Sequence, residues 1–291
     1  MADAELRRVV VAGGTGLVGR RLVAALVAAG TQVTVLSRTP GAMARSWEDL
    51  PGALEGADAV INLCGAGIAE RRWSPERKRL LADSRIGPTE RLARGMAAAG
   101  CGVLVNASAV GFYGSRDEQP VDERQGPGGD FLAQLCARWE AAATGARVVR
   151  LRLGVVLARD GGALPRMALP VRLFQGTRLG HGRQGLSWIH LDDLVRMIIE
   201  AAGNPAWRGP VNATAPVPVS NADFTRILAR RLHRPLLPVP AWLTGAAVRA
   251  LLGEMGVALL LEGAYVLPGA AQRLGFGFRF PRLEEALADL L

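Results

Sequence analysis

The glycine-rich turn near the N-terminus constrains the fold of this chain more than any other sequence feature. An apolar, β-branched run over residues 9–12 leads into the turn, and an Ala/Leu/Val-rich segment follows it. Gly14, Gly16 and Gly19 have the G-x-G-x-x-G spacing at the point where a strand passes into a helix. Glycines at these places allow a sharp turn, a close approach of backbone to a pyrophosphate, and tight packing of helix on strand. The motif therefore predicts a dinucleotide-binding βαβ unit; the alternative is a tight βα turn without a ligand.

The end of the second predicted strand indicates which dinucleotide is bound. Ser37 and Arg38 follow that strand, which is expected over residues 32–36. A site that prefers NAD places Asp or Glu here to bind the ribose 2′-hydroxyl, and this chain has neither. A guanidinium can instead bind a 2′-phosphate through two hydrogen bonds. We therefore expect NADP(H), with an ordinary surface arginine as the alternative.

Strands and helices alternate along the first half of the chain. Buried strands are expected over residues 59–65, 103–108 and 147–153. One helix is expected to begin near Ser74, and another is expected over residues 131–143. Strands that alternate with helices are typical of a parallel sheet with helices on both faces. The sequence therefore predicts an α/β fold built on a doubly wound parallel sheet.

The pattern changes in the second half. Residues 161–185 form a Gly/Arg-rich stretch that we expect to be irregular, and residues 211–214 form a late, short strand. Earlier in the chain, between residues 42 and 58, only one brief strand is expected, around residues 45–47. We divide the chain into an NADP-binding Rossmann domain, residues 1–165 plus 186–214, and a smaller C-terminal lobe on the substrate side, residues 166–185 plus 215–291.

Composition argues against several classes of protein. The chain has 291 residues, of which 49% are hydrophobic, enough for a sizeable core. The first residues have no apolar run of the kind found in a signal peptide, and no uninterrupted apolar run reaches the length of a membrane span. Cys64, Cys101 and Cys136 are far apart and odd in number, which fits reduced thiols in a cytoplasmic protein. We expect a cytoplasmic location and no membrane partner.

The formal net charge of +9 raises the question of a nucleic-acid partner. The basic residues are almost all arginine, are scattered along the sequence, and have few aromatic residues among them. Their densest cluster, residues 71–79, is interleaved with Glu70 and Glu76. We interpret the arginines as a solvated surface and expect no nucleic-acid partner.

Several motifs together resemble the extended short-chain dehydrogenase/reductase superfamily along nearly the whole chain. They are residues 13–16 with Gly19, residues 56–65, Tyr113-Gly114 and residues 188–193. More narrowly, the chain is similar to the epimerase family proteins, also called sugar-nucleotide epimerase-like proteins. The motifs for that likeness are Ser37-Arg38, Arg72-Trp73, Ser84-Arg85, residues 131–140 and residues 261–281. The resemblance implies an NADP-binding Rossmann domain and a C-terminal domain that would close over a substrate.

The resemblance also implies which residues hold the cofactor. Backbone at residues 63–65 would line the ribose and phosphate region on the adenine side, and Ser108 with Tyr113 would border the nicotinamide. The expected cofactor-binding residues are Gly13, Thr15, Gly16, Leu17, Val18, Gly19, Ser37, Arg38, Leu63, Cys64, Gly65, Ala107 and Ser108. No metal-ligand spacing is found, and no metal is expected.

The acid–base residues of the superfamily are missing. Short-chain dehydrogenases use a Tyr-x-x-x-Lys pair, in which the lysine lowers the tyrosine pKa. When the helix is registered on Glu140, Leu132 stands at the tyrosine position and Cys136 at the lysine position. When the strand end is registered on Tyr113-Gly114, Ala109 stands where the third catalytic residue, Ser or Thr, belongs.

Other groups are candidates for proton transfer. Tyr113 is the first candidate, with a packing role beside the cofactor as its alternative. His190 titrates near neutral pH and is the second, with a hydrogen-bonded structural histidine as its alternative. Ser108 is a third, because a one-residue bulge would bring it to the position of Ala109. His181 lies in a Gly/Arg loop, and Asp192 with Asp193 are expected as the N-cap and a first-turn acid of a helix.

Two classes of function fit these observations. The first is an NADP(H)-dependent oxidoreductase or epimerase-like enzyme that transfers a hydride to or from an unknown carbonyl or nucleotide-sugar-like substrate. The second is a regulatory or scaffold protein that binds NADPH without turnover, which the missing Tyr-Lys pair favours. Nucleic-acid binding through the arginines is a third, weaker hypothesis. A homodimer is also possible for a fold of this kind.

Overall fold

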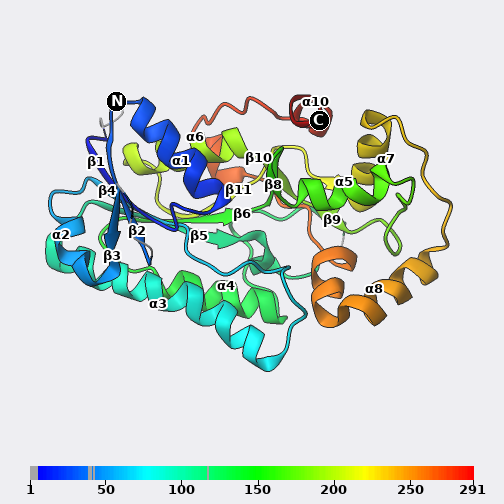
Figure 1. The fold of residues 1–291 in the computed structure, drawn as a ribbon, viewed down its shortest axis with the longest axis horizontal. Helices are drawn as coiled ribbons and strands as arrows, with labels where there is room; N and C mark the ends of the chain where they lie inside the picture. Colours follow the sequence, from blue (N-terminus) through cyan, green and yellow to red (C-terminus); the bar gives the residue numbers. More distant parts are fainter. Residues whose placement is uncertain (1–5, 39–40, 42, 117) are drawn as a thin grey trace.

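The computed structural model describes residues 6–38, 41, 43–116 and 118–291. Its centre is a seven-stranded parallel sheet with the order β11-β6-β5-β4-β1-β2-β3 (Figure 1). The predicted α/β fold with a doubly wound parallel sheet is therefore confirmed. The strands are β1 (Arg8–Ala12), β2 (Gln32–Ser37), β3 (Ala44–Ser46), β4 (Ala59–Asn62), β5 (Val103–Ala109), β6 (Val148–Leu153) and β11 (Gly209–Ala213).

The strand order reverses between β1 and β4, which are hydrogen-bonded neighbours with Val9 opposite Ala59. Strands β2 and β3 extend the sheet in one direction, and β5, β6 and β11 extend it in the other. In open α/β sheets, ligands bind beyond the carboxyl ends of the strands at such a reversal. The fold thus places the glycine-rich turn, which follows β1, at the expected binding crevice.

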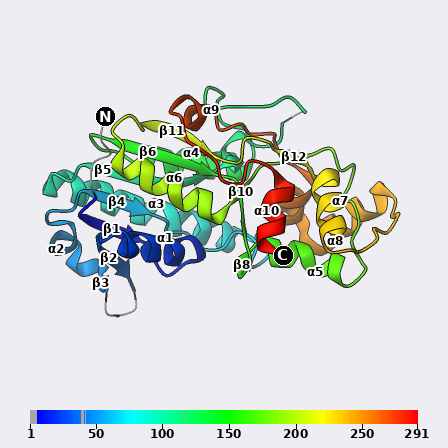
Figure 2. The same ribbon diagram turned by 90° about the horizontal axis from the view of Figure 1, so that it is seen from above.

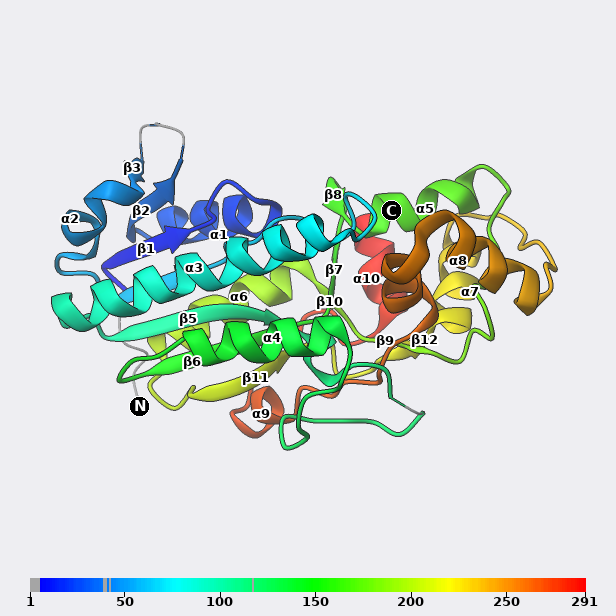
Figure 3. The same cartoon turned by 90° about the horizontal axis from the view of Figure 1, so that it is seen from below.

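Helices cover both faces of the sheet. Helices α1 (Leu17–Ala28) and α6 (Leu191–Gly203) lie side by side on one face (Figure 2), and α3 (Pro75–Ala99) and α4 (Phe131–Ala142) lie side by side on the other (Figure 3). Side chains of a strand point alternately to the two faces. Accordingly, Val9 and Val11 of β1 join the core beneath α1 and α6, whereas Val10 joins the core on the opposite face.

A second core lies beside the sheet, in a smaller part of the structure that we call the lobe from here on. It contains β7 (Val155–Ala158), β8 (Gly161–Gly162) and β10 (Trp188–His190), and the antiparallel pair β9 (Gly185–Leu186) and β12 (Val219–Ser220). Trp188, Phe224 and Leu287 are buried together in this core. The lobe helices are α5 (Leu164–Arg172), α7 (Asn221–Arg231), α8 (Ala241–Gly256) with the π-helical turn η3 (Val257–Leu261), and α10 (Leu283–Leu290).

The boundary between domain and lobe is crossed by the C-terminal part of the chain. Helix α9 (Gly269–Arg273) and the residues after it return to the large domain, where Ala271 and Phe276 are buried in the core beneath α1 and α6. The chain then re-enters the lobe as α10. The domain limits expected from the sequence remain a prediction.

Two local predictions are wrong. Residues 47–54 form a 3-10 turn, η1 (Trp47–Asp49), and a short helix, α2 (Leu50–Leu54), in addition to the expected brief strand. Within the stretch expected to be irregular, α5 forms with Pro165 in its first turn, where proline is tolerated. In α5, Leu164, Ala168 and Val171 are buried against the lobe core, so tertiary packing stabilises a helix that local glycines and prolines disfavour.

One helical segment, Ala241–Leu261, is long and apolar enough to cross a membrane by length and composition alone. Arg249 and Glu254 interrupt its apolar sequence, and Gly253 breaks the helical backbone with a φ of 60°. Lys78 of α3 forms an ion pair with Glu254 at 2.7 Å. In this structure the segment is a kinked surface helix of the lobe.

Candidate cofactor site

The turn after β1 packs so tightly that no side chain fits at Gly13 or Gly19. Gly13 has a φ of +79°, and a Cβ atom there would lie 2.7 Å from the carbonyl carbon of Leu63. A Cβ atom on Gly19 would lie 2.6 Å from the Cα atom of Gly14. The Leu63 amide donates to the carbonyl oxygen of Ala12 at 2.9 Å, so the ends of β1 and β4 are held together. We call the tightly packed backbone of residues 13–19 the glycine cradle; a turn of this kind allows backbone to approach a pyrophosphate closely.

The N-terminus of α1 faces this cradle without a side-chain cap. Gly16 is the capping residue, and the first turn contains no acidic side chain. The amides of the first helical residues, Leu17, Val18 and Gly19, have no acceptor within the helix. The positive end of the helix dipole adds to their preference for an anion. Arg20 donates to the carbonyl oxygen of Thr15 at 2.6 Å, which holds the turn in place.

Ser37 ends β2 and Arg38 follows it, at the same edge of the sheet as the turn after β1. Arg38 is exposed. Burial raises the pKa of the Cys64 thiol to about 11, and the positive charge of Arg38 acts in the opposite direction. Strands β2 and β4 pair in parallel with the two sides of β1, so Arg38 follows β2 at the same edge of the sheet as the turns after β1 and β4. The structure thus brings together the carboxyl ends of β1, β2 and β4 at one edge of the sheet.

A buried polar cluster supports the turn after β4. Asn62 donates to Thr89 at 2.8 Å and to Asn106 at 2.7 Å, and its amide oxygen accepts the backbone N–H of Cys64 at 3.1 Å. Trp139 donates to the Thr89 hydroxyl at 3.0 Å. Burying a polar group is favourable only when its hydrogen bonds are satisfied, as they are here. The cluster fixes the path of the chain at Leu63 and Cys64, and it was not predicted from the sequence.

Ser108 and Tyr113 belong to a second buried network beyond the end of β5. Ser108 donates to Glu140 of α4 at 2.7 Å. Glu140 accepts two hydrogen bonds from Arg152 of β6, at 2.8 and 2.9 Å. Arg152 also donates to the Tyr113 hydroxyl at 2.9 Å, and that hydroxyl donates to Asn212 of β11 at 2.7 Å. The network connects β5, α4, β6 and β11.

The Tyr113 hydroxyl both donates and accepts a hydrogen bond in this network. Its side chain is fully buried, and burial raises the pKa of its hydroxyl, with the nearby Arg152 acting in the opposite direction. The guanidinium of Arg152 stacks over Phe112 at 3.5 Å from the ring centroid. The geometry favours the packing role that was the alternative for Tyr113. The network itself was missed, although an arginine within an apolar parallel strand was the signal for it.

Leu132 and Cys136, the residues expected at the positions of the Tyr-Lys pair, both lie in α4. Both face the 3-10 turn η2 (Val110–Tyr113), since a Cβ atom on Gly111 would lie 3.4 Å from the Cβ atom of Leu132 and 4.0 Å from the Cys136 sulfur. Burial raises the pKa of the Cys136 thiol to about 12. Neither side chain supplies an acid or a base near neutral pH.

His190 has contacts of a structural kind. It is buried, its ring stacks on Phe280 with centroids 3.9 Å apart, and its Nδ1 accepts the backbone N–H of Asp192 at 3.1 Å. Its Nε2 lies 3.3 Å from a carboxylate oxygen of Asp289 on α10. His190 therefore joins α6 to the C-terminal segment, and its contacts are not shared with Tyr113 or Ser108.

The expectation that an aspartate caps α6 is wrong. His190 is the N-cap, and Asp192 and Asp193 both lie in the first turn. Asp193 is buried and accepts the backbone N–H groups of Arg279 and Phe280, each at 2.9 Å. Its carboxylate thus fixes the returning C-terminal segment, a tertiary role that the local sequence did not indicate. His181 is exposed, and its Nδ1 accepts the amide of Arg183 within its own loop.

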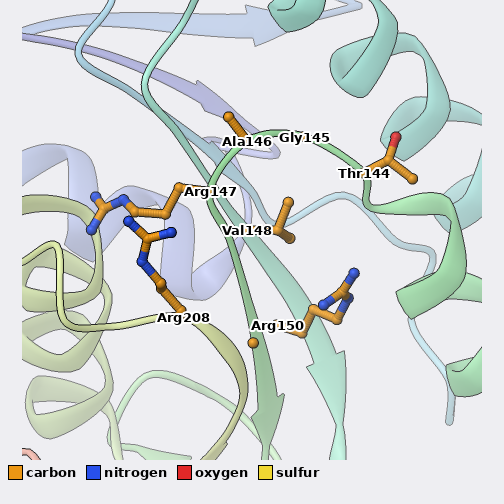
Figure 4. A pocket seen from close by; sticks show the side chains of 8 residues that line it. Thr144, Gly145, Ala146, Arg147, Val148, Arg150 and Arg208 are labelled. Carbon is orange, nitrogen blue, oxygen red and sulfur yellow. The ribbon is translucent and has the colours of Figure 1, made fainter.

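A hollow of about 390 Å³ lies at the opposite edge of the sheet, where β6 and β11 begin (Figure 4). Figure 4 shows the side chains of Arg147 and Arg208 close together beside it. Arg147 donates to the carbonyl oxygen of Asn204 at the end of α6. Because the strands are parallel, this hollow is remote from the carboxyl-end crevice. No group of three potential metal ligands occurs among the residues that the structure describes.

Comparison with protein families gives two matches. Residues 9–212 match the NAD dependent epimerase/dehydratase family. Residues 239–290 match a domain of unknown function, DUF1731. The first match contains the glycine cradle and the buried networks, and the second contains α8, α9 and α10.

Individual relatives align over almost the whole chain. Epimerase family protein Mb2239 of Mycobacterium bovis is 46% identical over 291 residues, which cover 96% of each protein. Epimerase family protein SDR39U1 of Bos taurus is 38% identical, covering 98% of this chain and 99% of that protein.

Solved structures agree with these sequence matches. The human epimerase family protein SDR39U1 (isoform 2) with NADPH has a TM-score of 0.90 and 35% identity, covering 97% of this chain and 98% of that one. The nucleoside-diphosphate sugar epimerase from Corynebacterium glutamicum has a TM-score of 0.80 and 34% identity, covering 98% of this chain and 58% of that one. MoeE5 in complex with UDP-glucuronic acid and NAD, at 21% identity and a TM-score of 0.75, shares the fold.

Proposed function

Since this chain belongs to the NAD dependent epimerase/dehydratase family, we propose that it binds NADP(H) and transfers a hydride to or from a carbonyl or nucleotide-sugar-like substrate. The observation that carries the proposal is the cradle at Gly13, which excludes a Cβ atom and lies beneath an uncapped helix N-terminus. The free amides and the positive end of the helix dipole fit a pyrophosphate, which a tight turn alone does not require. The human relative whose structure contains NADPH supports the same cofactor.

Each part of the crevice has a role in this proposal. The amides of Leu17, Val18 and Gly19 bind the pyrophosphate, and Thr15 and Gly16 shape the turn. Arg38 binds the 2′-phosphate as a doubly hydrogen-bonded cation, with Ser37 beside it. Backbone at residues 63–65 lines the adenosine side, and Ala107 with Ser108 borders the nicotinamide end.

NADPH, when bound, supplies a hydride from C4 of its nicotinamide ring. Reduction of a carbonyl also requires one proton at the carbonyl oxygen. Tyr113, His190 and Ser108 were the candidates. The hydroxyls of Tyr113 and Ser108 are already hydrogen-bonded in the buried network, and His190 lies in a separate set of contacts, with its ring stacked on Phe280. We propose that water delivers this proton and that Ser108 and Tyr113 hold the adjoining backbone in place.

A second function is favoured by the same networks. A protein that binds NADPH for regulation or as a scaffold needs a cofactor site but no acid or base. The raised pKa values of Tyr113 and Cys136 and the structural contacts of His190 fit such a protein. For either function we propose a cytoplasmic location, in accord with the three free thiols.

A turnover screen distinguishes the two functions. The purified protein is first titrated with NADPH to establish saturable binding. It is then incubated with NADPH and a panel of aldehydes, ketones and nucleotide sugars while the nicotinamide absorbance is followed. Substrate-dependent loss of absorbance supports the enzyme, whereas saturable binding without turnover on any substrate supports the regulatory protein. Absence of NADPH binding refutes both.

A variant control assigns any turnover to this site. Gly13→Ala should abolish NADPH binding and turnover together, because the added methyl group collides with the backbone of Leu63. Gly87→Ala is the matched control, since a Cβ atom on Gly87 meets nothing within 4 Å. Turnover that survives Gly13→Ala at the wild-type rate belongs to another site or to a contaminant.

A further inference from the structure

The net positive charge of the chain is concentrated in two stretches. Residues 161–191 contain four arginines and no Asp or Glu, and residues 224–253 contain five arginines and no Asp or Glu. The formal net charge is +9, from 35 basic and 26 acidic residues. The nine arginines in these two stretches therefore account for the whole of it, and the rest of the chain is electrically balanced.

The two stretches meet at one end of the lobe. The amide of Leu237 donates to the carbonyl oxygen of Gly176 at 2.8 Å, and the guanidinium of Arg234 lies over the Phe174 ring at 4.5 Å. The amide of Gly180 donates to Thr244 at 2.9 Å. We call residues 169–178 and 230–243 the lobe tip. It lies at the end of the long axis of the molecule, opposite α2 and β3 (Figure 1).

Large apolar side chains are exposed at the lobe tip. Trp242 has 73% of its surface exposed, and it is the one exposed tryptophan of the six in the chain. Phe174 is 54% exposed. The remaining exposed apolar residues of the tip are Leu169, Leu173, Leu237 and Leu243. They lie in two segments that are hydrogen-bonded to each other, and exposed apolar surface of this kind marks an interaction site.

Backbone strain occurs at the same place. Phe174 and His233 have φ values of 59° and 55°, and among the described residues they are the two non-glycine residues with positive φ. A bulky residue adopts this conformation at a cost of about 1–3 kcal/mol, and strain of this kind clusters at functional sites. The conformation of Phe174 holds its ring at the surface under Arg234 rather than in the lobe core.

We propose that the lobe tip binds the surface of an anionic lipid membrane. Exposed Trp, Phe and Leu side chains insert at the boundary between headgroups and acyl chains, and arginines around them bind anionic headgroups. Arg172, Arg178 and Arg230 are exposed at the tip, with no acidic residue in its sequence to oppose them. The proposal departs from the expectation that the chain has no membrane partner.

The positive charge and the exposed apolar side chains of the lobe tip together favour a membrane over a second copy of the chain or a nucleic acid. A second copy of the tip would bring like charges together, which disfavours association. A nucleic acid would use the arginines but gains little from exposed leucines, since phosphate contacts dominate its affinity. An anionic bilayer uses both kinds of side chain at once.

Co-sedimentation of the full chain with vesicles tests the proposal. Vesicles of phosphatidylcholine alone are compared with vesicles of phosphatidylcholine and phosphatidylserine. We expect binding to the second kind, weakened by salt, because salt screens the arginines. The emission of Trp242 should shift to shorter wavelength on binding, and this shift should disappear in Trp242→Phe.

Matched variants separate the tip from the rest of the surface. Each arginine near an anionic surface strengthens binding by about fivefold, so Arg172→Gln/Arg178→Gln/Arg230→Gln should weaken it roughly a hundredfold. Leu173→Ala/Trp242→Ala should also release the protein. The controls are Arg94→Gln/Arg138→Gln/Arg208→Gln and Val27→Ala/Leu80→Ala, which change exposed residues elsewhere.

Several results overturn the proposal. They are no binding to either kind of vesicle, equal binding to both kinds, and equal loss of binding in tip and control variants. Retention on DNA without vesicle binding would assign the tip to a nucleic acid. A dimer that dissociates in the tip variants, again without vesicle binding, would assign it to a second copy.

Discussion

Arg152 and Glu140 form a buried, doubly hydrogen-bonded ion pair between β6 and α4, with N–O distances of 2.8 and 2.9 Å. The pair lies at the centre of the network that also holds Ser108 and Tyr113. A buried charge without its partner is strongly unfavourable, because desolvation is then uncompensated. The pair therefore ties the carboxyl ends of β5 and β6 to α4, next to the proposed nicotinamide end of the crevice.

Glu140→Gln is expected to destabilise the protein substantially. The substitution leaves the Arg152 guanidinium buried without a carboxylate, at a cost of about 3–5 kcal/mol. Chemical denaturation followed by circular dichroism measures the change. Arg79→Gln removes the exposed ion pair with Glu76 and should leave the denaturation midpoint nearly unchanged. Similar midpoints for the two variants would contradict this account of the network.

The geometry at Gly13 predicts how a substitution there changes NADPH affinity, whether or not the protein is an enzyme. Gly13→Ala places a methyl group 2.7 Å from the Leu63 carbonyl carbon and forces alanine into a φ of +79°. We expect NADPH affinity to fall more than tenfold and stability to fall by about 1–3 kcal/mol. Isothermal titration calorimetry and thermal unfolding measure the two effects. Gly87→Ala, in α3, should retain both affinity and stability.

Arg38→Ala tests the choice between NADP(H) and NAD(H). Loss of a charge-assisted contact with the 2′-phosphate costs about 1.5–3 kcal/mol, so the NADPH dissociation constant should rise roughly tenfold to a hundredfold. The dissociation constant for NADH, which lacks that phosphate, should change little. Arg94→Ala, at another exposed arginine, serves as the control. An equal change for both dinucleotides would show that Arg38 does not bind the 2′-phosphate.

The sequence was informative wherever a short segment determines its own structure. The turn at Gly13–Gly19 places its glycines, strand and helix within a few residues, so spacing alone predicted the βαβ unit. The same holds for Ser74, whose hydroxyl accepts the amide of Arg77 at 3.2 Å as an N-cap. In both cases the physical cause and the sequence pattern lie within one turn of the chain.

The sequence was least informative where partners lie far apart along the chain. Tyr113 binds Asn212, which is 99 residues away, and Asp193 binds amides 86 and 87 residues away. Helix α5 forms because the lobe core buries one face of it, which local propensity does not reveal. Polar residues within apolar strands, such as Asn62 and Arg152, were visible signals of buried networks, but their partners required the fold.

The burial of His190 predicts how the stability of the protein changes with pH. Burial lowers the pKa of His190 below its usual value of about 6.5, although nearby aspartates act in the opposite direction. The unfolded chain therefore binds a proton at His190 more readily than the folded protein does. The stabilisation from neutral His190 is complete above about pH 6.5 and is lost as the pH falls towards the lower pKa of the folded state.

His190→Asn isolates this contribution, because asparagine caps helices well and does not titrate. The variant should lose less stability than the wild type when the pH is lowered below 6.5, measured by denaturation at a series of pH values. Titratable groups remote from His190 contribute equally to both proteins, so the difference between the two curves reports His190 and the aspartates beside it. His181→Asn, at an exposed histidine, is the matched control for replacing a histidine with asparagine. A wild-type curve that coincides with that of His190→Asn would show that His190 does not control stability in this range.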